Sequence, residues 1–370
     1  MMTREQNLNW KLQKLRELLA TGGYSALEIN SQTNFSWLTR GRGFIGLAAV
    51  AACGSIFVTA TNAHLVAENI EAQRLYVEQL DSSPQIEVRA FPWNKPERRT
   101  EIVAAITGGG RLATEQDMAG DLFRLRTVMT EYDLADYRKL CKETALILEE
   151  TVRGLTAGVS GYELAGEISK QFWAADIEPI TILSAFDGRA LQYRHPLPSA
   201  DRLENYALVA ICGRRNGLIA SITRNVLLRE DSLMIERQAK CAMVDAAATR
   251  RLKPGANVGE IFDAMVAEYA AQGYPGEEAF HHQGGLTGFI PREIRANTGN
   301  THTVREHEVY AFNPTLQGAK CEDTILVTET GFEVLTHTGS YAYVDCTVDG
   351  MTIQKPGILV LNEGRKEGMR

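Results

Sequence analysis

The sequence predicts an α/β protein of two domains: a small N-terminal α/β domain, residues 1–125, and a duplicated C-terminal domain, residues 126–370. Three observations predict this class. The length of 370 residues exceeds one ordinary hydrophobic core. Up to about residue 115 a helix precedes short apolar runs rich in strand-forming residues, and the chain then becomes predominantly helical. Two segments of the second domain also repeat each other.

The first predicted element is an amphipathic helix over residues 7–20, whose four leucines share one face and which stops at a Gly-Gly pair. The apolar runs SALEIN, AAVAACGSIFVTA and RLYVEQL follow between polar or glycine-containing turns, and they predict three strands. We place the linker near residues 115–132, where the composition changes. The helical stretch continues to about residue 155.

The internal repeat aligns residues 144–174 with residues 241–271 at a constant offset of 97, without a gap. The offset places Gly158 on Gly255, so each unit predicts a helix, a Leu-x-x-Gly turn and a second helix. Two similar halves then face each other across a cleft, the usual place for a ligand.

Carried forward, the same offset pairs Gly188 with Gly285 and His195 with Arg292. We therefore expect the two glycine-bearing segments to be counterparts, and His195 and Arg292 to enter one cleft from opposite halves.

A β-rich segment follows each helical pair. Residues 205–228 carry a GRRNG turn between apolar runs and predict a hairpin. Residues 307–337 contain KCEDTILV, which places Lys320, Glu322 and Asp323 at the mouth of a strand that enters the core.

Composition and charge exclude several classes of function. The chain has no apolar run of the length that a membrane helix needs, and its charged, amphipathic start lacks a signal peptide, so we expect a cytoplasmic protein without a membrane partner. A net charge of −7 and no long basic run exclude a nucleic-acid partner. The six scattered cysteines form no CxxC pair, which predicts free, mostly buried thiols.

Several motifs in this order resemble the pita-bread fold superfamily, which includes creatinase, prolidases, Xaa-Pro aminopeptidases and methionine aminopeptidases. The motifs are NFSWLTRGRGF in the N-terminal domain, PGANVGEIFDAMVAEY, the segment HHQGGLTGFIPRE (281–293), HEVYAFNP and GAKCEDTILVTETGFEVLT. The resemblance spans nearly the whole chain and implies a creatinase-like N-terminal domain before a pita-bread domain with an internal pseudo-twofold repeat.

The peptidases of this superfamily hold two divalent metals with two Asp, one His and two Glu, and the resemblance lets each position be checked. The first Asp falls on Ala210 or Ile211 and the second on Ser221. Gly285 stands where the metal-binding His belongs and Asn313 where the first Glu belongs. Of the five positions, Glu322 alone keeps the family's residue type. Hard divalent cations need several anionic oxygens or imidazoles, so we expect no metal ligands and no cofactor.

Other functional positions of the superfamily remain occupied, and creatinase is a precedent for hydrolysis without metal. His195 is the first choice for general acid/base, because imidazole titrates near neutral pH. His281, four residues before the lost ligand, is expected to stabilise developing charge, and Glu322 to position water or a substrate nitrogen. Because adjacent side chains point in different directions, His281 and His282 are not expected to do the same job.

Other residues are expected to bind a small substrate that bears a carboxylate, which arginine recognises with two hydrogen bonds. The predicted set combines cleft residues with two arginines of the N-terminal domain that, in a creatinase-like homodimer, would reach the neighbouring subunit's site. It comprises Arg292, His282, Gln283, Asn313, Lys320, Arg194, Arg224, Arg40 and Arg42. The alternative to substrate binding is ion pairing of these arginines with acids of the same chain, and for Arg40 and Arg42 it is a solvated basic turn.

We therefore expect a cytoplasmic, homodimeric, metal-independent hydrolase that cleaves a C–N bond of amide, amidine or urea type in a small carboxylate-bearing molecule. Three alternatives stay open: a metallopeptidase of the Xaa-Pro type with a rearranged site built from His281, His282 and Glu322, a lyase or isomerase, and a non-catalytic binding protein that kept the cleft.

Overall fold

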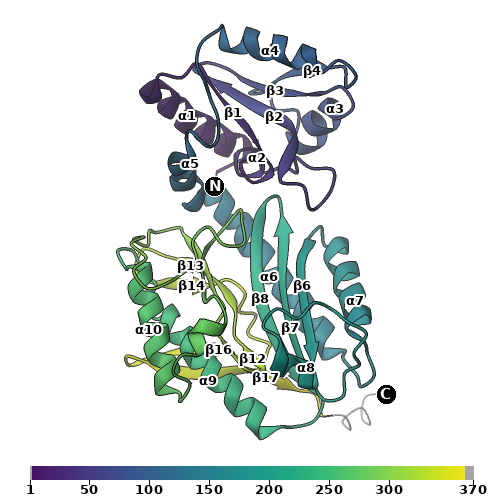
Figure 1. Ribbon diagram of the computed structural model, residues 1–370, viewed down its shortest axis with the longest axis vertical. Coiled ribbons are helices and arrows are strands. Elements are labelled where there is room, and N and C mark those ends of the chain that lie inside the picture. The colour runs from purple at the N-terminus through teal and green to yellow at the C-terminus, as the bar shows by residue number, and fades with distance from the viewer. Residues whose placement is uncertain (1, 363–370) are drawn as a thin grey trace. The chain divides into compact units, whose positions relative to one another are not determined.

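The computed structural model describes residues 2–362 and divides the chain into two compact units (Figure 1). The first unit extends to Ala135 and includes the turn Asn216–Leu218, and the second comprises Asp136–Arg215 and the described chain from Ile219 onward. No helix of the described residues has the length and apolar character needed to cross a membrane.

The first unit is a five-stranded sheet, in the order β4-β3-β2-β1-β5, with helices α1 to α5. Strands β1, β2 and β3 run antiparallel to one another, whereas β5 joins β1 and β4 joins β3 in parallel. The elements are α1 (Arg4–Gly22), β1 (Ala26–Ser31), α2 (Gln32–Thr39), β2 (Ala51–Thr59), β3 (Ala63–Glu68), α3 (Ala72–Arg74), η1 (Leu75–Gln79), β4 (Glu87–Phe91), α4 (Glu97–Thr107), β5 (Leu112–Ala113) and α5 (Ala119–Thr127).

The predicted first helix and the strands at SALEIN and AAVAACGSIFVTA are confirmed as α1, β1 and β2. The strand predicted at RLYVEQL is wrong, because this run forms the end of α3 and the π-helix η1. Leu75 and Leu80 are buried while Val77 is exposed. A spacing of five places two apolar side chains on one face of a π-helical turn, whereas a strand would place them on opposite faces.

The second unit contains two four-stranded sheets, ordered β17-β8-β7-β6 and β14-β13-β10-β9, and two small two-stranded sheets. Its helical elements are α6 (Glu131–Arg153, which starts in the first unit), α7 (Gly161–Ala174), α8 (Asp187–Gln192), α9 (Ser232–Thr249), α10 (Val258–Ala271) and η2 (Glu277–Phe280). Its strands are β6 (Glu178–Phe186), β7 (Tyr206–Arg215), β8 (Leu218–Leu227), β9 (Gly284–Thr287), β10 (Val309–Phe312), β11 (Thr315–Leu316), β12 (Ala319–Lys320), β13 (Asp323–Val327), β14 (Phe332–Val334), β15 (Tyr343–Val348), β16 (Met351–Pro356) and β17 (Ile358–Val360).

The predicted duplication is visible in the second unit. Helices α7 and α10 begin and end at the offset of 97, and each is capped by a polar side chain, Ser160 or Asn257. The turn glycines before them, Gly158 and Gly255, have φ angles of 89° and 87°, which favour glycine. The sheet orders also correspond, since β6-β7-β8 matches β9-β10-β13.

The predicted equivalence of Gly188 and Gly285 is wrong. Gly188 lies in helix α8, whereas Gly285 lies in strand β9. Strand β6 follows α7 almost at once, but the 3₁₀ helix η2 and a loop come between α10 and β9. This extra segment shifts the register of the second half beyond the helices.

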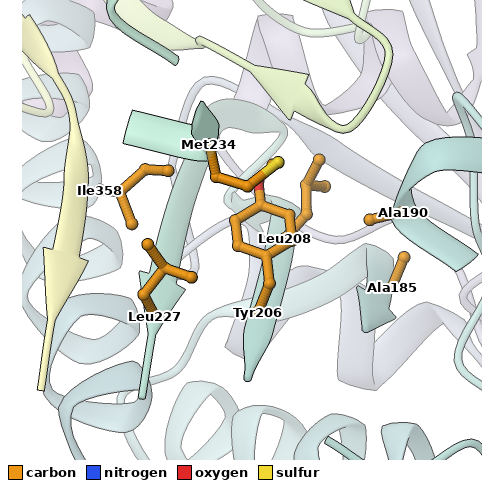
Figure 2. Close-up of a cluster of buried hydrophobic side chains, with 7 residues drawn as sticks. All are labelled: Ala185, Ala190, Tyr206, Leu208, Leu227, Met234 and Ile358. Carbon is orange, nitrogen blue, oxygen red and sulfur yellow. The ribbon is translucent and has the colours of Figure 1, made fainter. Parts of the chain in front are cut away.

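A hydrophobic cluster packs against the hairpin of β7 and β8 (Figure 2). Leu208 of β7 and Leu227 of β8 pack with Met234 of α9 and Ile358 of β17. Each buried side chain of this size contributes about 1.5–3 kcal/mol relative to its exposed state. The Tyr206 hydroxyl in the same cluster donates to the carbonyl oxygen of Gly318, at 2.7 Å. These contacts anchor the hairpin whose strand β7 borders the site described below.

Candidate functional site

The second unit contains a cavity of about 450 Å³ that brings together most of the predicted catalytic residues. It lies among β6, β7, the loop after α8, the segment around β9 and the loop before β13. The lining residues are Thr181, Leu183, His195, Ala210, Ile211, Cys212, His282, Ile290, Pro291, Arg292, Arg295, Asn313, Lys320 and Glu322. The expectation that His195 and Arg292 enter one cleft is therefore confirmed.

His195, which lines the cavity, meets His281, a histidine from a distant segment that lies behind the lining residues. The Nε2 atoms of His195 and His281 lie 2.9 Å apart, and their rings meet edge to face. His195 follows α8 in an exposed loop, which the hydrogen bond from the Ser184 amide to the Pro196 carbonyl ties to strand β6. His281 is buried, with 8% of its surface exposed. In a pair of neutral imidazoles one nitrogen donates and the other accepts.

His282 joins this pair. Its ring stacks on that of His281 with centroids 4.5 Å apart, and its centroid lies 5.6 Å from that of His195. The expectation that two adjacent histidines point in different directions is therefore wrong. His281 is in an extended conformation directly after η2, and the amide of Gly284 donates to Nδ1 of His282.

The surroundings of all three imidazoles lower their pKa values and so favour the neutral form. Burial, followed by the charge of Lys320, holds the pKa of His281 far below its ordinary value and lowers that of His195. Burial and the charge of Arg292 lower the pKa of His282 to about 4. A neutral imidazole has a free lone pair, so these rings can accept a proton or bind an electrophile.

The predicted substrate residue Gln283 lies behind the histidines, and it is fully buried. Its Nε2 donates to the carbonyl oxygen of His281, and its Oε1 accepts from the Tyr269 hydroxyl at 2.9 Å. Gln283 is not among the cavity-lining residues. Its geometry therefore supports positioning of the histidine segment, in place of the predicted contact with substrate.

Glu322 lies at the centre of an ion network on the cavity wall. Its Oε1 accepts from Nη2 of Arg292 at 2.8 Å, and its Oε2 lies 3.2 Å from Nζ of Lys320 and 3.0 Å from Oγ1 of Thr223. Burial alone would raise the pKa of Glu322, but Lys320 and Arg292 lower it. Glu322 is thus a carboxylate whose charge is already balanced, and it orients two cations toward the cavity.

The positions of the family's paired-metal site do not fit divalent metals. Ala210 and Ile211 offer only hydrocarbon, and Ser221 is fully buried, with its amide and carbonyl bonded to Thr324. Gly285 has a φ of 142°, and a Cβ there would lie 2.3 Å from the carbonyl oxygen of Ile294, so no histidine fits this backbone. The remaining carboxylate, Glu322, is occupied by Lys320 and Arg292.

Two polar groups on the cavity wall are available to a ligand. Oδ1 of Asn313 is buried and has no hydrogen-bond partner among the described residues. Arg295 is exposed, and none of the described residues forms an ion pair or side-chain hydrogen bond with it. Sequence reasoning missed Arg295, although it stands three residues after Arg292 in the same segment, and it also missed Cys212.

Two predicted arginines are held away from the cavity lining. Arg224 is fully buried and binds Glu149 at 2.9 Å and Asp323 at 3.1 Å. Arg194 forms an ion pair with Glu277 and donates to Thr315 Oγ1. These contacts match the alternative of ion pairing within the protein instead of substrate binding, and they give Arg224 a structural role.

Arg40 and Arg42 lie in the first unit. Arg40 is buried, and its Nε lies 3.4 Å from Oδ1 of Asp133. Oδ2 of Asp133 lies 2.9 Å from Nζ of Lys11. Arg40 is therefore part of an internal ion network rather than a solvated basic turn. The amide of Arg42 donates to the side chain of Gln79, and its role at a neighbouring subunit's site stays a prediction.

Comparison with known proteins agrees with this architecture. The sequence model of metallopeptidase family M24 matches residues 135–329. The chain is 22% identical over 352 residues to the uncharacterized peptidase YqhT of Bacillus subtilis, covering 89% of this chain and 98% of that protein. The prolidase from Pyrococcus horikoshii OT3 superposes with a TM-score of 0.71 at 19% identity, over 89% of this chain and 98% of its own. Dipeptidase PepE from Mycobacterium ulcerans gives 0.72 at 16% identity, over 91% and 97%.

Proposed function

The chain belongs to metallopeptidase family M24, a family of hydrolases, and within it we propose a hydrolase that cleaves a C–N bond of a small carboxylate-bearing molecule without the family's paired metals. One observation carries the proposal. The neutral imidazoles of His195 and His281 meet at 2.9 Å beside a cationic cavity wall, while four of the five metal-ligand positions have lost the family's residue type and the fifth, Glu322, is paired with Arg292 and Lys320.

His195 is the proposed general acid/base. Of the two paired rings it is the more exposed, so a positive charge on it costs less than on the buried His281. As water attacks the carbon of the scissile C–N bond, His195 takes the proton of the water, and it returns this proton to the nitrogen as the bond breaks. His281 holds the ring of His195 through the Nε2–Nε2 hydrogen bond.

The cavity wall favours an anionic substrate. Arg292 and Lys320 share the single charge of Glu322, and Arg295 adds a cation with no ion-pair partner among the described residues. A carboxylate bound here would make charge-assisted hydrogen bonds, the strong kind. The free Oδ1 of Asn313 would accept a hydrogen bond from a substrate N–H group.

The test is a substrate panel of Xaa-Pro dipeptides, N-carbamoyl amino acids and guanidino acids, incubated with the purified full chain, with products identified by mass spectrometry. We expect turnover of a carboxylate-bearing compound in this panel, at a rate that a strong chelator leaves unchanged. Since general acid/base catalysis contributes about 10²–10⁴-fold, His195→Ala should lower the rate by at least about 100-fold.

The matched control is His307→Asn. His307 is a partly exposed histidine outside the cavity lining, with a φ of 65° that asparagine tolerates, so this variant should keep the parental rate. Turnover that requires added Mn²⁺ or Co²⁺, or an unchanged rate in His195→Ala, would contradict the proposal. Binding of these anions without any product would point to the non-catalytic alternative.

A further inference from the structure

His195 and His282, which line the cavity, and the adjacent His281 converge closely enough to share one ion. One nitrogen from each of His195, His281 and His282 can be chosen so that all three lie within 4.8 Å of one another. The ligands come from two segments, the loop after α8 and the stretch between η2 and β9. None of the three stands at one of the five positions that match the family's paired-metal ligands.

We propose that His195, His281 and His282 form a single-metal site for an imidazole-preferring ion of the Zn²⁺ class. Tetrahedral zinc with Zn–N distances of about 2.0–2.1 Å requires ligand nitrogens about 3.3 Å apart. The Nε2 atoms of His195 and His281 are 2.9 Å apart and the His282 nitrogen lies within 4.8 Å of both, so side-chain rotations that move the pair slightly apart and bring His282 closer complete the triangle. The cavity leaves the fourth position open to water or an anion.

The chemistry of the donors selects the ion. Three imidazoles suit Zn²⁺, Co²⁺, Ni²⁺ and Cu²⁺, whereas Mg²⁺, Ca²⁺ and Mn²⁺ prefer carboxylate and carbonyl oxygens. The nearby carboxylate of Glu322 is already bound by Lys320 and Arg292. The site therefore differs in both ligands and metal preference from the five-residue centre that the resemblance implies.

The protein environment supports this geometry. Gln283 fixes the backbone of His281 from the core. A neutral His282 that binds a metal through Nε2 carries its proton on Nδ1, so Nδ1 can no longer accept from the Gly284 amide. The hydrogen bond that would be lost is long and weak, at 3.3 Å. The cations that lower the pKa values of these histidines also oppose a bound metal, and this opposition is reduced because Arg194 is paired with Glu277, and Lys320 and Arg292 with Glu322.

The test is calorimetric titration of the chelator-treated full chain with zinc chloride. We expect one equivalent of bound Zn²⁺, with affinity more than about tenfold weaker in His195→Ala and in His282→Ala. Co²⁺ in place of Zn²⁺ should give the intense visible absorption of a four-coordinate site. His307→Asn, checked with the others by circular dichroism, should bind as the parent does.

Three outcomes would overturn the site: no saturable binding of Zn²⁺, binding that both cavity variants leave unchanged, or a Co²⁺ spectrum of six-coordinate type. Since His195 is exposed, its replacement by alanine is expected to leave folding intact, and the spectrum then reports on the ligands directly.

A consequence for activity rests on the proposed function. An imidazole bound to zinc cannot accept a proton, so saturating Zn²⁺ should abolish hydrolysis and a chelator should restore it. Turnover that persists with zinc bound would reject His195 as the base and leave the site intact. Absence of zinc binding with unimpaired turnover would reject the site and leave the hydrolase.

Discussion

Gln283 Nε2 donates a hydrogen bond of 2.6 Å to the carbonyl oxygen of His281, two residues earlier in the chain. The amide is fully buried, and the Tyr269 hydroxyl fixes its other end. A core residue therefore sets the backbone from which the cavity histidines project.

Gln283→Leu should destabilise the fold, because it leaves the His281 carbonyl and the Tyr269 hydroxyl buried without these partners. We expect a loss of about 1–3 kcal/mol in the free energy of unfolding, measured with urea. Gln13→Leu on the exposed face of α1 is the control, with an expected change within about 0.5 kcal/mol. Equal unfolding curves for the two variants would refute the role of Gln283.

Arg224→Met should cost far more than removal of a surface arginine. It strands the carboxylates of Glu149 and Asp323 in the core, and breaking a buried ion pair typically costs about 3–5 kcal/mol. Arg138→Met removes an ion pair with Glu333 in which both side chains are exposed, and it should cost less than about 1 kcal/mol. Urea unfolding of the two variants measures the contrast, and similar losses would show that Arg224 is not structural.

Because of Asp133, the free energy of unfolding of the first unit should depend on pH in the acid range. Burial opposes its charge, but Lys11 and Arg40 lower its pKa below the ordinary value of 3.8. A lowered carboxyl pKa stabilises the fold above the ordinary value, and this contribution disappears as the pH falls through the folded-state pKa.

Asp133→Asn should therefore be less stable than the parent at neutral pH, by about 3–5 kcal/mol, and the two should converge as the pH falls below 3.8. Unfolding free energies across this range provide the measurement. Asp121→Asn removes an exposed pair with Arg124 and should show little of this dependence. A constant difference at every pH would contradict the assignment.

Arg295→Ala should weaken binding of the anionic substrate that the proposed function requires. Loss of a charge-assisted hydrogen bond worth about 1.5–3 kcal/mol corresponds to a rise in KM of about tenfold or more. The kcat should change less, because Arg295 is not part of the histidine pair. Arg98→Ala on the exposed α4 serves as control. An unchanged KM would place the carboxylate elsewhere.

Much of the architecture follows from periodicity and register in the sequence. The turn glycines Gly158 and Gly255 reveal the duplication because both occupy the same positive-φ turn. The register of HHQGGLTGFIPRE places Gly285 at the lost ligand, and the structure leaves no room for a side chain there. Sequence patterns therefore predict a site position correctly where the local backbone conformation allows only one type of residue, as it does at Gly285.

What sequence reasoning could not supply depends on tertiary contacts. Residue type does not distinguish Arg224 from Arg295, yet Arg224 lies in the core and Arg295 borders the cavity. The partner of Arg224 on α6 is 75 residues away, at Glu149. The segment of η2 directly precedes the stacked His281 and His282, and its presence shifts the repeat.

The close approach of Gly285 to Ile294 also limits how this pocket can change. The amide of Ala296 binds the carbonyl of Gly284, which draws residues 294–296 against β9 and fills the space that a histidine would need. Reintroducing the family's ligand therefore requires two coupled events, a substitution and a displaced segment. Each alone is expected to destabilise the fold, because the substitution clashes with the Ile294 carbonyl and the displacement breaks the hydrogen bond between Ala296 and Gly284.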